Sequence, residues 1–243
     1  MSLGALRAAI VFLTRIPVGL GAAPSPLSTA VPWFPVVGAA IGAAVAGVYA
    51  AGETGLPATL AAALAVTVGL LVTGAFHLDG LADVADAVAG GSTPERRLEI
   101  LDDPRVGTYG AAAIVLQLLI HVLAIAALSP ADALAALVVA HGLGRSAAVA
   151  LMGIGRPAKD HGLGVDYLAD LGRGQVLVGV GLGVVSTALL GWAGLSAIGA
   201  SILVVTLMLV LARRVFGGIG GDVLGATEQV TESAVLLVAV AAI

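Results

Sequence analysis

Uncharged, strongly apolar runs recur along the chain, and short stretches rich in polar residues, glycine or proline separate them. A helix of about 20 apolar residues is long enough to cross the hydrocarbon core of a bilayer. We predict seven membrane-spanning segments, at residues 33–51, 57–76, 107–128, 131–153, 174–193, 195–213 and 230–243. The last segment is short, so we expect it to begin a turn or two earlier, within residues 223–229. The predicted fold is an all-α, polytopic membrane helical bundle forming a single domain, residues 1–243.

The composition supports this class, since 59% of the residues are hydrophobic and only 11% are charged. Soluble domains contain about 25% charged residues. The net charge of −4 and the lack of any Lys/Arg run longer than two residues argue against a nucleic-acid partner. With no cysteine, the chain has neither disulfides nor thiolate metal sites. The apolar run between Arg7 and Arg15 is too short for a signal peptide and predicts an interfacial helix with basic anchors.

The charged residues fall on one side of the predicted membrane. Ten of the eleven Lys and Arg residues lie in alternate loops, and the positive-inside rule makes these loops cytoplasmic. Thirteen of the fifteen acidic residues lie on the same side, whereas the opposite loops contain only Glu53 and Asp132. We therefore expect the chemistry at the cytoplasmic face of the cell's inner membrane, with the N-terminus inside and the C-terminus outside.

The stretch from His77 to Gly110 holds seven of the fifteen acidic residues. Asp79, Asp83 and Asp86 fall within an arc of roughly 60° on a helix that we predict for residues 79–89. Three carboxylates on one face repel one another unless a cation lies among them. A solvated acidic loop explains them poorly, because they stand among apolar residues at the end of a span. We predict that these aspartates bind a divalent metal, with Asp83 and Asp86 also candidates for catalysis.

Turn signals divide the remainder of this stretch. The glycine pair at 90–91 ends the first helix, and Ser92 or Thr93 caps a second helix with Pro94 in its first turn. Pro104 ends that second helix. A second connection then leads into the third span.

Four more residues of this stretch are candidates for the site. Asp102 and Asp103 either join a second metal or are ordinary loop residues. Arg105 either contacts a phosphate through its planar guanidinium or pairs with Asp102. His77 is a candidate base or phosphate donor, although a single histidine at the end of a span is more often structural.

A second acidic cluster follows four glycines within residues 217–221. Glycine lets backbone N–H groups approach an anion, and carboxylates beside it suit a metal. A flexible linker is the alternative, but linkers rarely end in an acidic helix that re-enters the membrane. We predict phosphate binding by Arg213, Gly220 and Gly221, and metal binding by Asp222 and Glu228.

Two other places carry polar residues. His141 and Arg145 lie on one face of the fourth segment, where Arg145 either contacts a phosphate or forms an internal ion pair with an aspartate. The loop Arg156–Asp166 either closes over a ligand or simply connects two spans.

Acidic clusters, a glycine-rich turn and arginines on one face suit phosphoryl transfer, in which Mg²⁺ offsets charge on the phosphates. A membrane transporter with an acidic cation site is the alternative from another class. Transporters place ionisable groups near the midplane and often contain inverted repeats, and neither feature is evident here. An alcohol phosphotransferase of the CDP-alcohol type also uses clustered aspartates on a membrane helix.

The runs GAFHLDGLADVADAVAGG and ERRLEILDDPRVGTYG, with FLTRIPV before them and GGIGGDVLGATEQVTE after them, resemble the cobalamin synthase family. This family is also called adenosylcobinamide-GDP ribazoletransferase. Asp79, Asp83 and Asp86 match its acidic motif, and Asp222 and Glu228 match its glycine-rich acidic motif. Three places depart from its pattern, namely Ala87, Asp103-Pro104 and Gly220.

The resemblance implies a Mg²⁺-dependent integral membrane enzyme with two small-molecule substrates. A ribose hydroxyl of α-ribazole, or of its 5′-phosphate, attacks the cobinamide-linked phosphorus of adenosylcobinamide-GDP. GMP leaves, and adenosylcobalamin or its 5′-phosphate is formed. The sequence leaves the oligomeric state open.

Overall fold

The computed structural model of the protein describes residues 2–19, 26–158 and 170–242. Within these ranges all regular secondary structure is helical, apart from one isolated bridge between Pro157 and Ile219. Six helical stretches are long and apolar enough to cross a membrane: Leu27–Glu53, Thr108–Ala126, Pro130–Ile154, Arg173–Leu190, Ala193–Phe216 and Gly221–Ala241. A bent pair of helices raises this number to seven if the pair counts as one span. The predicted all-α polytopic membrane bundle is confirmed.

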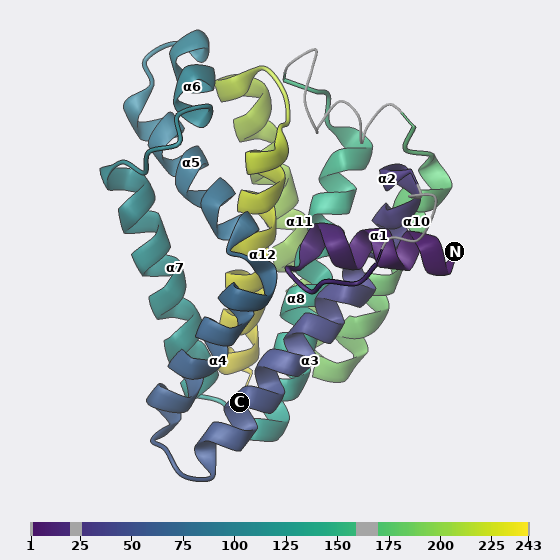
Figure 1. Ribbon diagram of the computed structural model, residues 1–243, viewed down its shortest axis with the longest axis vertical. Coiled ribbons are helices and arrows are strands. Elements are labelled where there is room, and N and C mark those ends of the chain that lie inside the picture. The colour runs from purple at the N-terminus through teal and green to yellow at the C-terminus, as the bar shows by residue number, and fades with distance from the viewer. Residues whose placement is uncertain (1, 20–25, 159–169, 243) are drawn as a thin grey trace.

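Two of the long helices form the centre of the bundle. The spanning helices are α3 (Phe34–Glu53), α7 (Thr108–Ala126), α8 (Pro130–Ile154), α10 (Arg173–Ser186), α11 (Ala193–Leu211) and α12 (Gly221–Ala241). In the apolar stretches of α8 and α12, 72% and 67% of the residues are buried, against 28% for α7 and 17% for α10. Figure 1 shows α12 between α5 (Phe76–Gly90) and α8, and α12 packs mainly against these two helices. Polar groups on α8 and α12 are therefore shielded from lipid.

Glycines set the closest helix contacts. A Cβ added at Gly38 on α3 would clash with Arg145 and with the backbone oxygen of His141, and one at Gly42 would clash with Leu137. Small residues at this spacing let helix backbones approach closely in a membrane. The Gly38-xxx-Gly42 pattern therefore serves helix packing, and it brings α3 against α8 beside Arg145.

The second predicted span, residues 57–76, forms as helix α4 (Ala58–Thr73), but the chain bends sharply at its end. The acidic helix α5 (Phe76–Gly90) follows at an angle of 92° to α4. Gly74 and Ala75 both have left-handed backbone conformations, with φ of 67° and 56°. The bend costs backbone energy at Ala75, because a Cβ is disfavoured there. It redirects the acidic helix α5, which begins three residues before the predicted start.

The last predicted span, residues 230–243, begins earlier, as expected from its short length. Helix α12 runs from Gly221 to Ala241, so it starts two residues before the range 223–229 in which we expected its beginning. Glu228 and Glu232 interrupt the apolar pattern, but both are almost fully buried inside the helix, with 1% of their surface exposed. These two glutamates lower the hydropathy of the sequence at the start of the span. They can nevertheless be buried there, because their ionic partners lie on other helices.

The connection between α5 and α7 forms as predicted. The acidic helix ends at the glycine pair, with Gly91 as its C-cap. Helix α6 (Pro94–Leu101) is capped by Thr93, whose side chain accepts a hydrogen bond from the backbone N–H of Arg96.

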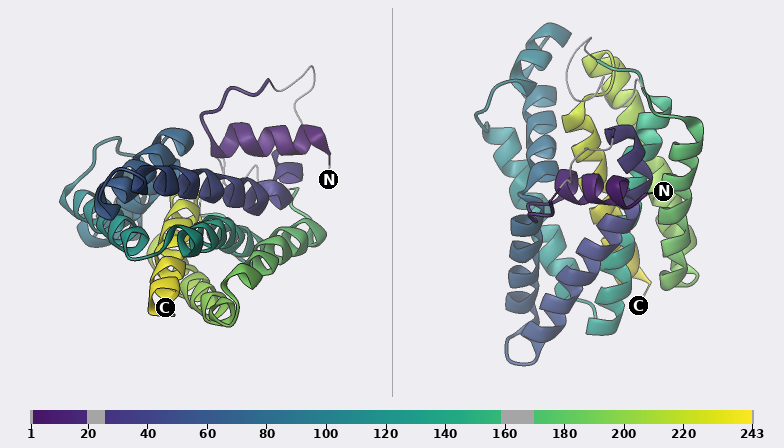
Figure 2. Two further views of the ribbon diagram at one scale, coloured as in Figure 1. Left: turned by 90° about the horizontal axis from the view of Figure 1, so that it is seen from below. Right: turned by 45° about the vertical axis from the view of Figure 1, so that its right-hand side comes forward.

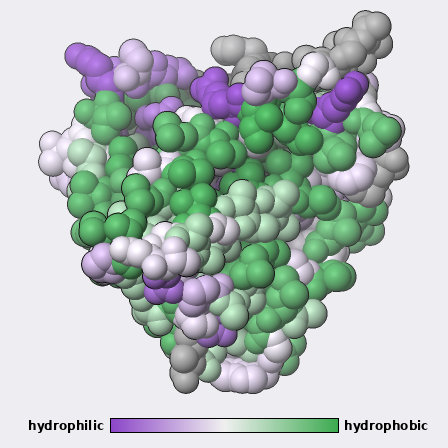
Figure 3. Space-filling view, turned by 60° about the horizontal axis from the view of Figure 1, so that its bottom comes forward, coloured by the Kyte–Doolittle hydropathy of each residue, from purple (hydrophilic) through white to green (hydrophobic). Residues whose placement is uncertain are grey.

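The N-terminal helix α1 (Leu3–Leu13) lies across the bundle rather than along it (Figures 1 and 2), as expected of an interfacial helix. Two residues after this helix, the backbone N–H of Arg15 donates a hydrogen bond to the backbone oxygen of Val72, near the end of α4. Helix α6 lies at one end of the molecule and the C-terminus near the other (Figure 1). Figure 3 shows a broad hydrophobic belt with hydrophilic residues gathered along one rim. This polar end carries the candidate site.

Candidate active site

The two acidic stretches of the sequence lie on α5 and α12, which pack directly against each other. A Cβ at Gly80 would lie 2.9 Å from the Cα and carbonyl oxygen of Asp222, and one at Gly225 would lie 3.2 Å from the Cα of His77. The two glycines therefore allow the backbones to meet. The contact brings the HLDGLAD stretch beside the start of α12.

Four carboxylates gather around this contact. Asp83 is half-buried, and the negative charges of Asp79, Asp222 and Asp86 all act on it. Such repulsion is relieved when a cation binds among the carboxylates. Carboxylate oxygens are the ligands that Mg²⁺ prefers, so the donor chemistry fits this ion. In the parts of the chain that the structure describes, no three Asp, Glu or His side chains converge on a preformed metal site.

Asp86 has a structural partner that the sequence pattern did not predict. Its Oδ2 accepts a hydrogen bond of 2.7 Å from the N–H of Gly107, and its Oδ1 accepts one of 2.9 Å from the N–H of Gly110. A Cβ at either glycine would collide with the carboxylate. Asp86 therefore caps the start of α7, and this capping engages both of its carboxylate oxygens. Its role is structural in this respect and differs from the role predicted for Asp79 and Asp83.

Arg105 pairs with Asp103 instead of the expected Asp102. Its Nε and Nη2 donate to the two carboxylate oxygens of Asp103 over 2.9 and 2.6 Å. These hydrogen bonds hold the pKa of Asp103 at about 2. Arg105 is largely exposed, and Asp102 is the exposed C-cap of α6. The turn after α6 is thus clamped by its own ion pair.

The deepest polar feature is the guanidinium of Arg145 on α8, of which 1% is exposed. Its Nη2 lies 2.7 Å from Oε1 of Glu228 and its Nη1 lies 2.5 Å from Oε1 of Glu232. The predicted internal ion pair is present, but its partners are glutamates of α12 and not aspartates. A buried charge is tolerated only with such partners.

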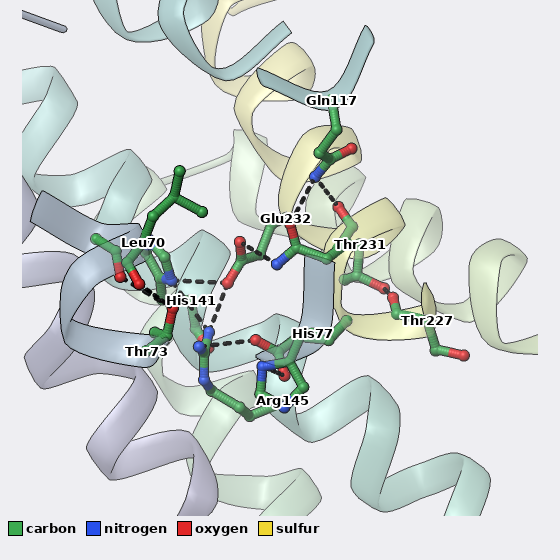
Figure 4. Close-up of polar contacts among 12 residues, drawn as sticks. Leu70, Thr73, His77, Gln117, His141, Arg145, Thr227, Thr231 and Glu232 are labelled. Atoms are coloured by element: carbon green, nitrogen blue, oxygen red, sulfur yellow. Dashed lines mark hydrogen bonds and ion pairs between the residues drawn. The ribbon is translucent and has the colours of Figure 1, made fainter. Parts of the chain in front are cut away.

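Two histidines complete this network (Figure 4). His77 Nδ1 lies 2.8 Å from Oε2 of Glu228, and His141 Nδ1 lies 2.7 Å from Oε1 of Glu232. Both oxygens of Glu228, a predicted metal ligand, therefore face basic groups of the protein. His77 is buried at the start of α5, which links the network to the acidic helix.

Comparison with known proteins places the chain. A family model described as "Cobalamin-5-phosphate synthase" matches residues 5–240. The chain belongs to this family. It is therefore a membrane-embedded enzyme of cobalamin biosynthesis.

Its relatives match over nearly their full length. Adenosylcobinamide-GDP ribazoletransferase of Azorhizobium caulinodans is 42% identical, covering 95% of this chain and 92% of the relative. The proteins of the same name from Bradyrhizobium diazoefficiens and Citrobacter koseri are 41% and 36% identical, covering 97% and 95% of this chain and 93% and 96% of the relatives. No solved structure matches the chain.

In this chain the glycine-rich turn is anchored by the loop that begins at Arg156. The backbone N–H of Ile219 donates to Arg156 over 2.7 Å, and that of Ala158 donates to Ile219 over 2.9 Å. Gly218 has no room for a Cβ against Pro157, and Gly217 has a positive φ of 78°. These glycines therefore serve the turn itself.

Gly220 and Gly221 form the start of α12, directly before Asp222. Phosphate binding by this pair stays a prediction. Arg213 is exposed, and its Nη2 donates to the carbonyl oxygen of Ile154 over 3.3 Å. Residues 159–166 of the predicted closing loop lie outside the described residues.

The polar network reaches α7 through Gln117, which the sequence did not indicate, and through the buried His121. Gln117 Nε2 donates to the backbone oxygen of Gln229 over 2.8 Å and lies 2.9 Å from Nε2 of His121 (Figure 4 includes Gln117). Ser233 donates to Oε1 of Gln117 over 2.8 Å. The partners of Gln117 could not be predicted from the sequence, because they lie on α12, more than 100 residues away.

Proposed function

We propose that the chain transfers the adenosylcobinamide-phosphate group from adenosylcobinamide-GDP to α-ribazole or α-ribazole 5′-phosphate. GMP is released, and adenosylcobalamin or its 5′-phosphate is formed. The printed name of the relatives suggests this reaction. The observation that carries the proposal is the close crossing of α5 and α12 at Gly80, which gathers Asp79, Asp83 and Asp222.

These three aspartates are the residues that would hold Mg²⁺. When bound there, Mg²⁺ would supply positive charge that offsets the negative charge of the diphosphate and of the departing GMP. Asp79 is exposed, while Asp83 and Asp222 are half-buried. The set is thus open on one side to a soluble diphosphate substrate.

The acceptor needs a group that takes its proton. A ribose oxygen bonds to the phosphorus attached to cobinamide, the bond from that phosphorus to GMP breaks, and the hydroxyl proton passes to a base. We assign the base to His77, since Glu228 engages Nδ1 and leaves Nε2 as the available ring nitrogen. Glu228 acts as a positioning residue that fixes the ring.

We also propose that the polar end of the bundle faces the cytoplasm from the inner membrane. The loops at this end carry nearly all Lys and Arg residues, which the positive-inside rule assigns to the cytoplasm. Nucleotide-linked substrates then reach the carboxylates without crossing the bilayer.

The test uses the purified full-length enzyme in nanodiscs with adenosylcobinamide-GDP and α-ribazole. We expect equimolar GMP and adenosylcobalamin, no turnover after chelation of divalent ions, and recovery on adding Mg²⁺. GMP release that does not need α-ribazole would make the protein a hydrolase. Full turnover in the chelated sample would contradict the Mg²⁺ assignment.

A further inference from the structure

A cavity beside the carboxylates has walls of two different kinds. Helices α1, α3, α5, α8 and α12 all contribute to it, and three phenylalanines form its aromatic part. The rings of Phe12 and Phe34 stack with centroids 5.5 Å apart, and Phe76 meets Phe12 edge-on at 5.4 Å. Phe12 packs against both other rings and Phe34 is buried, so the partly exposed Phe76 offers the aromatic surface on which a planar ligand can stack.

Another part of the lining is polar and buried, and one of its hydrogen-bond donors has no partner. Arg145 and Glu228 line the cavity, each with 1% of its surface exposed. Glu228 Oε1 forms an ion pair with Arg145 Nη2 over 2.7 Å, whereas Arg145 Nε has no hydrogen-bond partner in the structure. Buried polar atoms are almost always satisfied, so this unpartnered donor at the cavity points to a ligand that accepts a hydrogen bond.

The cavity also adjoins the proposed reaction centre. His77, the proposed base, lines it, and so does Gly221, which directly precedes Asp222. A ligand with its ring among the phenylalanines therefore has its polar end within reach of the acidic cluster.

We propose that this cavity holds the heterocyclic base of the acceptor nucleoside. α-Ribazole is a benzimidazole nucleoside, with a flat bicyclic ring, one unsubstituted ring nitrogen that accepts a hydrogen bond, and ribose hydroxyls that donate. The ring nitrogen accepts from Arg145 Nε, a ribose hydroxyl donates to Glu228, and the attacking hydroxyl lies at His77. This inference rests on the proposed function and names the part of the site that selects the acceptor.

Phe76 is the residue for the test, because 40% of its surface is exposed and its removal leaves no sealed void. Stacking of a base on an aromatic side chain contributes about 1–3 kcal/mol, or roughly a 5- to 150-fold change in affinity. Phe76→Ala should raise the KM for α-ribazole about tenfold or more and leave the KM for adenosylcobinamide-GDP unchanged. Trp192→Ala is the matched control, since Trp192 is exposed and lies outside the cavity.

Two further variants separate an aromatic ligand from a lipid chain. Phe76→Tyr keeps a ring and should keep the KM, whereas Phe76→Leu keeps only apolar volume and should behave like Phe76→Ala. Binding of α-ribazole alone, by titration calorimetry without the second substrate, should weaken in the same order. Equal affinities across all variants, or full rescue by Phe76→Leu, would overturn the inference while leaving the proposed function intact. Absence of turnover in the unaltered enzyme would instead defeat the proposed function itself.

Discussion

At the scale of single residues, Arg145 decides whether the interior of the bundle can carry two carboxylates. Its guanidinium faces both Glu228 and Glu232. His77 contacts the other oxygen of Glu228, and His141 contacts the same oxygen of Glu232 as Arg145 does. Without a cation the two carboxylates would be stranded in a medium that solvates charge poorly. The ion pairs of Arg145 are therefore needed for the stability of the folded protein, whatever they also contribute to catalysis.

Replacing Arg145 with methionine tests this role. We expect Arg145→Met to lower the free energy of unfolding by about 3–5 kcal/mol, as for other buried ion pairs that lose one partner. Unfolding in detergent, followed by circular dichroism, measures the loss. Arg96→Met is the control, because the Arg96–Glu99 pair is exposed and should contribute about 1 kcal/mol or less. A stable Arg145→Met protein with weak substrate binding would instead favour the phosphate contact that the sequence left open.

The limits of sequence reasoning are clearest at these same residues. The spacing of His141 and Arg145 predicted a shared helix face, and Arg145 could only be given an acidic partner of unknown position. Its partners lie 83 and 87 residues further along the chain, on a helix whose apolar pattern they themselves interrupt. Long-range pairing of this kind follows from how the helices pack, which local patterns do not encode.

At the scale of helices, glycine contacts decide which acidic residues meet. The aspartates of α5 approach Asp222 because Gly80 has no side chain. The same principle lets Gly107 and Gly110 bring the start of α7 onto Asp86. The close helix contacts at these glycines therefore determine where the carboxylates of the site lie.

Gly80→Ala tests the contact. The added Cβ would lie 2.9 Å from the backbone of Asp222, so α5 and α12 must move apart. We expect GMP release to fall at least about tenfold, since misplacement of metal-binding groups by a fraction of an ångström is costly in catalysis. Gly47→Ala is the matched control, because a Cβ at Gly47 meets nothing within 4 Å. Equal activity of the two variants would show that the crossing does not set the site.

The helix boundaries could be predicted from the sequence where residues with strong local conformational preferences mark them. Thr93, Pro94 and Gly91 mark the ends of α5 and α6 where their conformational preferences predict them. The bend at Gly74 and Ala75 was missed, because the apolar run continues through it and a positive φ at alanine has no sequence signal. A left-handed alanine is stabilised only by its surroundings.

At the scale of the whole molecule, the face drawn in Figure 3 is largely hydrophobic over its middle and carries hydrophilic residues along its upper rim. Helix α1 crosses the bundle on the side of the aromatic cavity, to which it contributes Phe12 and Leu13. An amphipathic helix in this place suits a bundle whose polar end meets the membrane surface. We infer the orientation in the membrane from the charge of the loops.

A cysteine-free chain makes that orientation directly testable. Thr54→Cys lies in the exposed connection between α3 and α4, and Glu99→Cys lies on the exposed face of α6. We expect a membrane-impermeant maleimide to label position 54 in intact spheroplasts and position 99 only after lysis. The reverse pattern would invert the topology and remove the cytoplasmic assignment of the site.

The central claim is that α5 and α12 jointly form one Mg²⁺-dependent site, and the most direct measurement compares a carboxylate from each helix. GMP release is titrated with Mg²⁺ for Asp83→Asn, Asp222→Asn and the exposed control Glu99→Gln, each first shown to unfold at the temperature of the unaltered protein. We predict a loss of at least about a hundredfold in both aspartate variants, because each removes a charged ligand of the metal, and an unchanged titration for the control. An unaltered Mg²⁺ response in either aspartate variant would contradict a site shared between the two helices.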